Sequence, residues 1–474
     1  MGVETILLVI AISFGFYMAW SIGANDVANA MGTSVGSGAL TIKRAVIIAA
    51  VVEFAGAFFV GSHVSETIRK GIISPELFQA DPMELVYGMT GALLAAAVWL
   101  QIASYFGWPV STTHSIVGSV LGFGVVVGGL HAADWGKVGS IAASWVVSPL
   151  MSGTLAFLIF KLIRRLIYFN HQPIKAAKRV TPFIVFIVFF ILTLAMVFKG
   201  LKNLHLNLSF GGALLTATIV GIVALIIAYF LVQRIEPFPL EDEVFRSQPL
   251  LVRLGLPKVL QQLNRITRAA KGEVKEKLSD IQEDLEEIKE EVDRTEEYEK
   301  LNPEYKSVQG IFAYLQILSA GFVAFAHGAN DVANAVGPLA AVINVLQTNR
   351  VTMQTQVSPW ILALGGVGII IGLATWGWRV MITIGKKITE LTPTRGFAAE
   401  FSAATTIVLA SKLGLPISTT HTLVGAVLGV GLARGISALN LRTIFDIVIS
   451  WIITIPVGAG GAIITYYLMK LIFG

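Results

Sequence analysis

Apolar runs about as long as a membrane-spanning helix follow one another along most of the chain, and they constrain its fold more than any other feature. A helix needs about 20 apolar residues to cross the hydrocarbon core of a bilayer. Charged residues make up only 14% of the 474 residues, against about 25% in soluble proteins. We therefore expect an all-α polytopic membrane protein with about 12 membrane segments. The candidate runs lie near 4–22, 41–62, 84–106, 109–130, 138–163, 182–198, 209–232, 309–326, 358–384, 396–413, 416–433 and 443–473.

Two of these runs differ from the others because they start with a proline and are rich in glycine. They begin at Pro109 and Pro416. Proline resists helix at such a position, and glycine permits close packing or a tight reversal. Re-entrant hairpins are therefore an alternative to full spans for these two runs, and we expect broken helices in the fold.

Acidic residues are concentrated in one stretch between two apolar parts of the chain. Of the 30 Asp and Glu residues, 18 lie between Glu236 and Glu304. Within this stretch apolar residues recur at alternating spacings of 4 and 3, which is a heptad pattern. We predict a charged cytoplasmic helical linker over 236–308, with a partner-binding or regulatory role as the alternative to a plain solvated hairpin. The stripe comprises Val274, Leu278, Ile281, Leu285, Ile288 and Val292.

Lys and Arg residues predict the orientation of the chain in a cell (inner or plasma) membrane. Basic residues follow the fifth and seventh runs, at 164–179 and 234–253, and short basic loops favour the cytoplasm. Counting back places the N-terminus outside. The first run has no basic leader or cleavage pattern, so we expect it to be retained as a span. The chain has no cysteine, which excludes disulfides and thiolate chemistry, and its basic balance requires no nucleic-acid partner.

Two motifs occur twice, in the same order. Residues 23–32 read GANDVANAMG and residues 328–337 read GANDVANAVG, with nine of ten positions identical. Residues 109–124 and 416–431 match at eleven of sixteen positions around the shared sequence STTH. Seven runs separate the two starts, so the second copy is predicted to enter from the opposite side, as two inverted repeats. We divide the chain into a first repeat (1–163), connecting spans (164–235), the linker (236–308) and a second repeat (309–474).

The GAND motif supplies polar oxygen ligands inside an apolar run. Asn25, Asp26, Asn330 and Asp331 are the candidate ligands. Asp in the middle of a membrane costs about 2.5–3.5 kcal/mol on insertion scales, which makes it a candidate for function. The preceding glycines would allow the helix to unwind and expose carbonyl groups. Such oxygens suit a hard cation such as sodium, although Asn and Asp are also ordinary helix caps.

The STTH motif supplies hydroxyl groups at the start of a helix. A helix N-terminus presents free N–H groups and the positive end of its dipole, so two such ends could hold a tetrahedral oxyanion. Plain capping is the alternative. With no fixed Lys or Arg in the motif, bound cations would have to balance the charge of the anion. The candidate ligands are Ser111, Thr112, Thr113, Ser418, Thr419 and Thr420.

Some polar residues in the apolar runs occur in one half of the chain only. Glu400, whose counterpart is Leu93, is a candidate cation ligand or proton site, with a buried ion pair as the alternative. Gln101 is a candidate anion contact. Glu53 and Arg379 are interpreted as structural, and His327 has no equivalent before the first motif.

His114 and His421, which end the two STTH motifs, allow several interpretations. Hydrogen bonding within the fold is one, and a proton relay is another. A Ser–His nucleophile pair is the third, although no acidic residue lies nearby in the sequence to orient the imidazole.

The doubled GANDVANA and P[VI]STTH sequences resemble the inorganic phosphate transporter (PiT) family over about 400 residues. The resemblance implies symport of inorganic phosphate with sodium or protons across a plasma membrane. It also implies cation-site roles for the Asn and Asp residues of both GAND motifs, and phosphate and cation contacts for the hydroxyls of both STTH motifs.

These observations predict a secondary active transporter that imports phosphate by alternating access, with no cofactor and no enzymatic activity. The oxygen ligands favour sodium as the coupling ion, and protons are the alternative. Another oxyanion such as sulfate or arsenate, an anion channel, and a membrane enzyme that uses Ser and His are the rival interpretations. Phosphate, sodium or protons and the lipid bilayer are the expected partners, and a homo-oligomer is left open.

Overall fold

The fold was analysed in a computed structural model that describes residues 2–61, 72–73, 75–199, 209–235, 250–301, 303–351, 357–412 and 417–474. The first part of the predicted linker (236–249) and Pro416 lie outside these residues. Within them the chain is helical, and the β-structure consists of one isolated bridge between Ile73 and Ala133. The prediction of an all-α polytopic membrane protein is confirmed.

The helices of the first part of the chain alternate long spans with shorter segments. They are α1 (Val3–Asn25), α2 (Val27–Gly36), α3 (Ile42–Val60), α5 (Pro82–Phe106), α6 (Thr112–Gly128), α7 (Trp135–Ile163), α8 (Pro173–Lys199) and α9 (Phe210–Gln233). The remainder comprises α10 (Leu250–Ala269), α11 (Glu273–Leu301), α12 (Pro303–Thr348), α13 (Pro359–Trp376), α14 (Trp378–Ile382), α15 (Pro393–Lys412), α16 (Thr419–Arg434) and α17 (Leu441–Phe473).

Eight helical segments in the described residues are long and apolar enough to cross a bilayer. All twelve predicted runs contain a helix, but α6 has only 17 residues and α16 only 16. Both short helices belong to the proline-initiated runs. The described residues thus contain fewer long spans than the twelve predicted. Two of the shorter helices are those for which a re-entrant hairpin was the alternative prediction.

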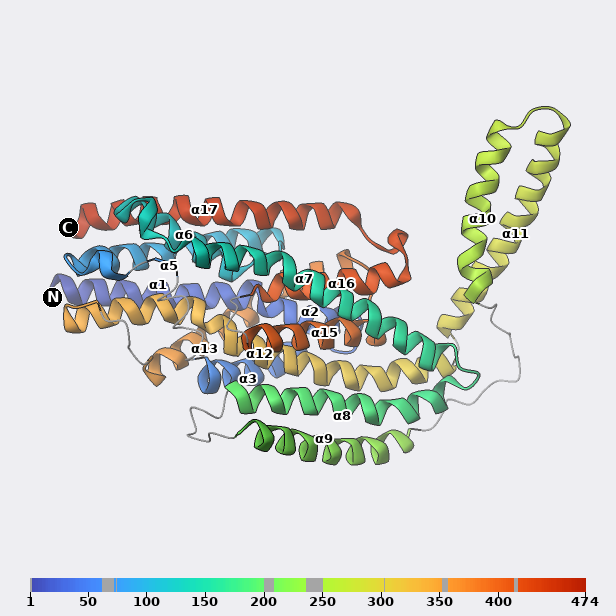
Figure 1. Cartoon of the computed structure of the whole chain (residues 1–474), viewed down its shortest axis with the longest axis horizontal. Coiled ribbons are helices and arrows are strands. Elements are labelled where there is room, and N and C mark those ends of the chain that lie inside the picture. The colour runs from blue at the N-terminus through green and yellow to red at the C-terminus, as the bar shows by residue number, and fades with distance from the viewer. Residues whose placement is uncertain are drawn as a thin grey trace.

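Most of the long helices lie side by side, as Figure 1 shows, with both termini at one end of the bundle. The α10–α11 hairpin projects at the opposite end and across the direction of the long helices (Figure 1). Helix α1 starts at the end with the termini, whereas α12 starts at the hairpin end, so the two helices that carry the GAND motifs run in opposite directions (Figure 1).

Helices from the first and last parts of the chain interleave through their glycines. A Cβ atom on Gly23 of α1 would lie 1.9 Å from the backbone oxygen of Ile369 in α13, and one on Gly328 of α12 would lie 2.3 Å from that of Glu53 in α3. Contacts this short leave no room for a side chain. Each GAND helix therefore packs backbone to backbone against a helix from the other part of the chain.

These contacts correct the prediction that both motif glycines unwind the helix. Helix α12 continues unbroken for 46 residues through Gly328, and α1 is interrupted only at Asp26, whose backbone stays in the right-handed helical region. Glycine permits an unusual backbone angle and also close approach, and here the close approach to a neighbouring helix accounts for its presence.

The two short helices interleave in the same way. Helix α6 packs on α17, and α16 packs on α7. A Cβ atom on Gly122 would lie 2.6 Å from the Cα of Ala459, and one on Gly429 would lie 2.0 Å from the backbone oxygen of Gly153. The two parts of the chain thus share one continuous interior.

Candidate functional site

The site is built first by two helix N-termini. Ser111 caps α6 by accepting a hydrogen bond from the backbone N–H of His114 at 3.2 Å, and Ser418 caps α16 in the same way from His421 at 3.1 Å. The capping interpretation of these two serines is therefore correct. It leaves the next two threonines of each motif free to point their hydroxyls elsewhere.

Each Asp of the GAND motifs accepts a hydrogen bond from a threonine of its own part of the chain. Thr112 donates to Asp26 Oδ2 at 2.6 Å, and Thr419 donates to Asp331 Oδ2 at 2.7 Å. All four side chains are buried. The two motifs, which lie about 80 residues apart in each copy, thus form two equivalent pairs.

A second set of contacts crosses between the two copies. Asn29 donates through Nδ2 to Thr420 Oγ1 at 2.8 Å, and the equivalent Asn334 donates to Thr113 Oγ1 at 3.3 Å. Thr420 also donates to Asp26, which is the other copy's carboxylate. The two predicted half-sites are therefore one connected polar cluster.

Both carboxylates of this cluster lie close to His327. Its Nε2 is 2.7 Å from Asp331 Oδ2 and 4.0 Å from Asp26 Oδ2, and one ligand atom from each of the three residues falls within 4.8 Å of the others. On the other side of the ring, Nδ1 lies 3.2 Å from Glu53 Oε1. All four side chains are almost fully buried. Carboxylates this close in a buried site repel one another unless a positive charge lies between them.

The two motif asparagines before the aspartates have different surroundings. Asn25 donates to Ser104 Oγ and to Trp108 O, each at 3.0 Å, and accepts from Val110 N. It fastens the end of α5 and the connection to α6. Asn330 donates instead to Asp331 Oδ1 at 3.0 Å. A direct cation contact stays a prediction for both.

Glu400 lies in a second buried cluster made by hydroxyl and amide donors. Its Oε1 accepts from Thr33, Ser34 and Gln316 at 2.5, 2.7 and 3.1 Å, and its Oε2 accepts from Ser319 at 2.6 Å. The surroundings described for this carboxylate contain no basic side chain, so the buried ion pair that the sequence allowed is not formed there.

Gln101 is half-buried on α5, where its Oε1 accepts a hydrogen bond from the Tyr17 hydroxyl. The contacts described for it do not reach the threonine cluster. Its role as an anion contact stays a prediction that needs a change of side-chain conformation.

His327 and Glu53 are central to the cluster, although the sequence pattern did not predict a site role for either. Neither residue is marked by the duplication: His327 corresponds to Ile22 at the motif offset of 305. A signal was present in the spacing of four residues between His327 and Asp331, which brings both side chains to one face of a helix.

The histidines of the two STTH motifs contact each other edge to face and lie between two tryptophans. His114 and His421 are 4.3 Å apart between ring centroids, and they lie 3.7 Å from Trp145 and 3.6 Å from Trp451, respectively. Among the described contacts, the hydroxyls of Ser111 and Ser418 accept from backbone N–H groups, and neither hydroxyl donates to an imidazole nitrogen. This geometry is that of a packed contact between α6 and α16, not of a Ser–His nucleophile pair.

The donor set of the cluster suits a hard cation. Carboxylate, hydroxyl and amide oxygens converge there, and Oδ1 of Asn29 is buried with no hydrogen-bond partner. A buried acceptor of this kind is expected to have a partner, and a cation would supply one. Oxygen ligands favour ions such as sodium over softer metals.

A buried polar cluster at the meeting point of two short helices, inside a helical bundle that crosses a membrane, is typical of a membrane transporter. The comparisons with known proteins specify the class. The chain belongs to the Phosphate transporter family, whose sequence profile matches residues 22–462.

Relatives from distant organisms are similar over nearly the whole chain. The chloroplastic inorganic phosphate transporter 2-1 of Arabidopsis thaliana is 46% identical over 95% of this chain and 70% of its own length. A putative phosphate permease of Chlamydia trachomatis is 44% identical over 99% of both chains. A solved structure, described as the sodium-dependent phosphate transporter, has a TM-score of 0.79 at 39% identity and covers 98% of this chain and 99% of that one.

Proposed function

We propose that this protein imports inorganic phosphate by symport with sodium. The observation that carries the proposal is the pair of buried carboxylates, Asp26 and Asp331, joined by hydroxyls from two helix N-termini. Sodium bound at the carboxylates would supply the positive charge that phosphate needs. Coupling then follows from charge, because each ion is poorly stabilised without the other. The name of the sodium-dependent structural neighbour supports the choice of cation.

Alternating access around this site is part of the proposal. Helices α1 and α12 run in opposite directions, and equivalent contacts link the motifs of both copies, which supports two inverted repeats. In such an arrangement the two repeats exchange conformations, so the site opens first to one side of the membrane and then to the other. The end of α7, the start of α8 and the end of α9 lie at the hairpin end (Figure 1). Basic residues occur in the sequence at these three places, namely Arg164, Lys178 and Arg234, which supports a cytoplasmic position for that end.

Glu400 is proposed as part of a second cation site. Its two oxygens accept from hydroxyls and an amide that have oxygen atoms of their own, so a sodium ion could bind among them. The site would add a cation to those at the threonine cluster.

Proton coupling is the second candidate, and His327 favours it. The imidazole lies between the two aspartates and Glu53 in a fully buried position. Histidine changes charge near neutral pH more readily than other side chains, so a proton on this ring could take the place of a cation beside Asp331.

The test is uptake of radiolabelled phosphate by proteoliposomes, with sodium and pH gradients imposed separately. We expect uptake to follow an inward sodium gradient at constant pH. Asp26→Asn and Asp331→Asn should each abolish it, since both remove a buried negative charge while keeping nearly the same shape.

Other outcomes decide between the rivals. Uptake that follows a pH gradient without sodium would replace sodium coupling by proton coupling at His327. Competition by sulfate as strong as that by unlabelled phosphate would contradict phosphate selectivity. Near-normal sodium-driven uptake in both Asp variants would place the cation site elsewhere.

A further inference from the structure

An arginine lies inside the apolar run that predicts the ninth membrane segment. Arg379 belongs to α14, directly after the break at Gly377 that separates α13 from α14. Basic residues within membrane segments are rare, and they pair with carboxylates or with backbone carbonyls. The contacts that the structure describes for Arg379 include no carboxylate, so another partner must stabilise its charge.

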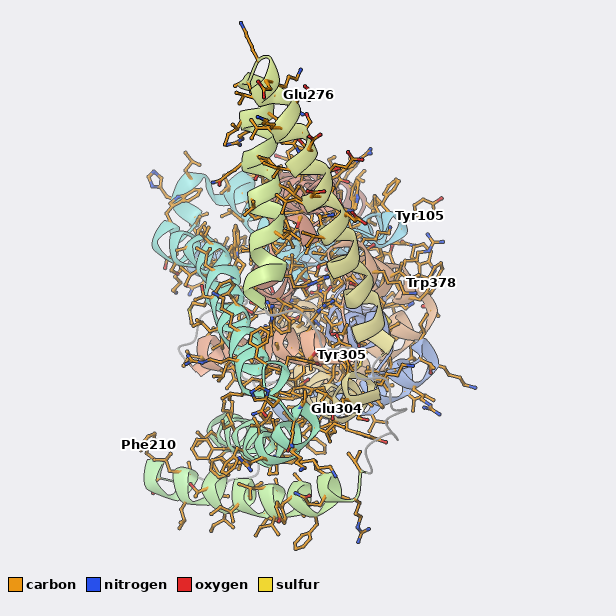
Figure 2. All side chains as sticks on the ribbon, turned by 90° about the vertical axis from the view of Figure 1, so that its right-hand side faces the viewer. Tyr105, Phe210, Glu276, Glu304, Tyr305 and Trp378 are labelled. Atoms are coloured by element: carbon orange, nitrogen blue, oxygen red, sulfur yellow. The ribbon has the colours of Figure 1, made fainter. Side chains whose placement is uncertain are left out.

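That partner is the end of α5. Nη1 of Arg379 donates to the backbone oxygen of Tyr105 at 3.1 Å. The guanidinium carbon lies 4.9 Å from the centre of the Tyr105 ring, 5.2 Å from that of Trp376 and 5.3 Å from that of Trp378. The faces of aromatic rings stabilise a cation where water is scarce. Tyr105 and Trp378 lie on the same side of the bundle (Figure 2).

The carbonyl that Arg379 contacts is one that a helix leaves without a partner of its own. The last four carbonyls of a helix have no donor within the helix, and α5 ends at Phe106, one residue after Tyr105. These carbonyls are also the negative end of the helix dipole, which a nearby cation stabilises. Arg379 therefore caps the C-terminus of α5 and offsets the negative end of its dipole.

The turn after α5 leads directly to α6, whose first residues belong to the polar cluster. Four backbone carbonyls around this turn accept hydrogen bonds from side chains of four other helices, namely α14, α1, α17 and α16. The donors are Arg379 for Tyr105, Asn25 for Trp108, Trp451 for Pro109 and Thr420 for Val110. Of these four donors, Arg379 alone carries a permanent positive charge.

The same turn packs closely on the chain around Arg379. Gly107 has a φ of +70°, in the left-handed region that favours glycine. A Cβ atom there would lie 3.1 Å from Thr383 Oγ1 and 3.4 Å from the backbone oxygen of Arg379. A displacement of α14 would therefore move the turn, and with it Ser111 and Thr112 at the start of α6.

The second copy has a basic residue at the equivalent place in the sequence. At the offset of 307 that aligns the two STTH motifs, Tyr105 corresponds to Lys412, the last residue of α15. In the first copy this position is a tyrosine, and the basic residue comes from α14 instead. Both helices that lead to an STTH motif thus have a basic residue at their negative end.

We propose that Arg379 is a positioning residue for phosphate, an assignment that rests on the proposed function. Its hydrogen bond to Tyr105 holds the turn so that Thr112 and Thr113 face the cluster, and its charge offsets the negative end of α5 beside the anion. Loss of this charge weakens the binding of an anion and favours that of a cation, because the two Coulomb interactions have opposite signs. A purely structural arginine would change both affinities in the same direction.

Uptake of radiolabelled phosphate by proteoliposomes tests this assignment. Arg379→Met removes the charge and keeps a long side chain. Its phosphate KM at saturating sodium should rise about tenfold. The sodium concentration for half-maximal uptake, measured at saturating phosphate, should stay unchanged or fall. The matched control is Arg442→Met, since Arg442 is exposed at the start of α17 and its loss should leave both values unchanged.

Three further variants separate the charge from the shape of the side chain. Arg379→Lys keeps the charge and a donor, so its phosphate KM should lie closer to the wild type than that of Arg379→Met. Tyr105→Lys in the Arg379→Met background reproduces the residue of the second copy and should restore part of the phosphate affinity. Arg379→Gln, which keeps an N–H donor without the charge, replaces Arg379→Met if the latter shows no melting transition in detergent.

Three results would overturn the assignment while leaving the proposed function intact. They are an unchanged phosphate KM in Arg379→Met, a parallel rise in the phosphate KM and the sodium requirement, and a phosphate KM in both lysine variants as high as in Arg379→Met. A wild-type protein that takes up no phosphate would contradict the proposed function itself, and this assignment with it.

Discussion

At the scale of single residues, the arrangement of donors around a buried carboxylate distinguishes a cation site from a structural anchor. Glu400 accepts four hydrogen bonds from neutral side chains. Neutral donors stabilise the carboxylate but leave its charge unbalanced, and an unpaired buried charge is costly. A bound cation resolves this cost, so Glu400 should respond to the ion and not to the phosphate.

We predict that Glu400→Gln shifts the sodium dependence of uptake with little change in the phosphate KM. Gln preserves the shape of the side chain and one acceptor oxygen for Thr33 and Ser34 while removing the charge. The sodium concentration for half-maximal uptake should rise roughly tenfold, which corresponds to about 1.4 kcal/mol.

Initial rates of phosphate uptake over a series of sodium concentrations would measure this shift. Ser319→Ala is the comparison, since it removes one donor and keeps the carboxylate. A larger rise in the phosphate KM than in the sodium requirement would move Glu400 from a cation site to the anion path.

The residues that could be predicted from the sequence are those that occur twice. Asp26, Asp331 and the paired threonines were found because duplication marked them, and the structure places them in one cluster. His327 and Glu53 could not be found in this way. Their contact joins residues from distant parts of the chain, and nothing in the local pattern specifies that Glu53 faces the imidazole.

At the scale of helices, glycine determines which elements approach closely. A Cβ atom on Gly372 of α13 would lie 1.8 Å from the backbone oxygen of Trp20 in α1, and one on Gly56 of α3 would lie 2.2 Å from that of Phe325 in α12. Small residues at such contacts let helices pack in a bilayer, where burial against lipid-like surfaces supplies no net hydrophobic force.

We predict that Gly372→Ala and Gly56→Ala each destabilise the protein, by about 1–3 kcal/mol, as expected for overpacking. The added methyl group meets backbone, which cannot rotate away as a side chain can. Thermal unfolding in detergent, followed by circular dichroism, would measure the loss as a lower melting temperature.

The matched control is Gly321→Ala on α12. A Cβ atom there meets nothing within 4 Å, so the better helix propensity of alanine should leave stability unchanged or raised by up to about 1 kcal/mol. Equal destabilisation at all three positions would show that helix contact is not the cause.

The helices themselves could be predicted from runs of apolar residues, but their continuity could not. The motif predicts unwinding at Gly328, whereas α12 runs through it. Glycine serves equally for a bend and for close packing, and only the neighbouring helix determines which use applies. For the same reason, the close contact between Gly122 and Ala459 could not be predicted from the sequence.

At the scale of the whole molecule, the two copies make equivalent helix contacts, but the residues at two of the equivalent positions differ. Gly23 of α1 packs on Ile369 of α13, and the equivalent Gly328 of α12 packs on Glu53 of α3. Glu53 therefore occupies the place that Ile369 has in the other copy, just as His327 corresponds to Ile22. The order of the motifs predicts two related copies, but this interleaving could not be predicted, because α3 and α13 share no visible sequence pattern.

The departure from symmetry yields a prediction for the buried pair of Glu53 and His327. His327→Ile leaves Glu53 without its partner and removes the imidazole from between Asp26 and Asp331, so it should cost roughly 3–5 kcal/mol of stability. Glu53→Ile should cost less, because Asp331 still lies 2.7 Å from the imidazole. The double variant should be more stable than His327→Ile, since it removes one of the buried carboxylates that the imidazole no longer contacts, but it should stay below the wild type because Asp26 and Asp331 still lack the imidazole.

Phosphate uptake and thermal stability should respond differently to these replacements. The double variant removes the imidazole nitrogen that lies 2.7 Å from Asp331, so phosphate uptake should stay low although part of the stability lost in His327→Ile is restored. Melting temperatures and uptake rates of the wild type, both single variants and the double variant would test the two expectations together. Normal uptake by the double variant would make the pair a purely structural contact, and a double variant no more stable than His327→Ile would mean that the unpaired Glu53 carboxylate is not the source of the loss.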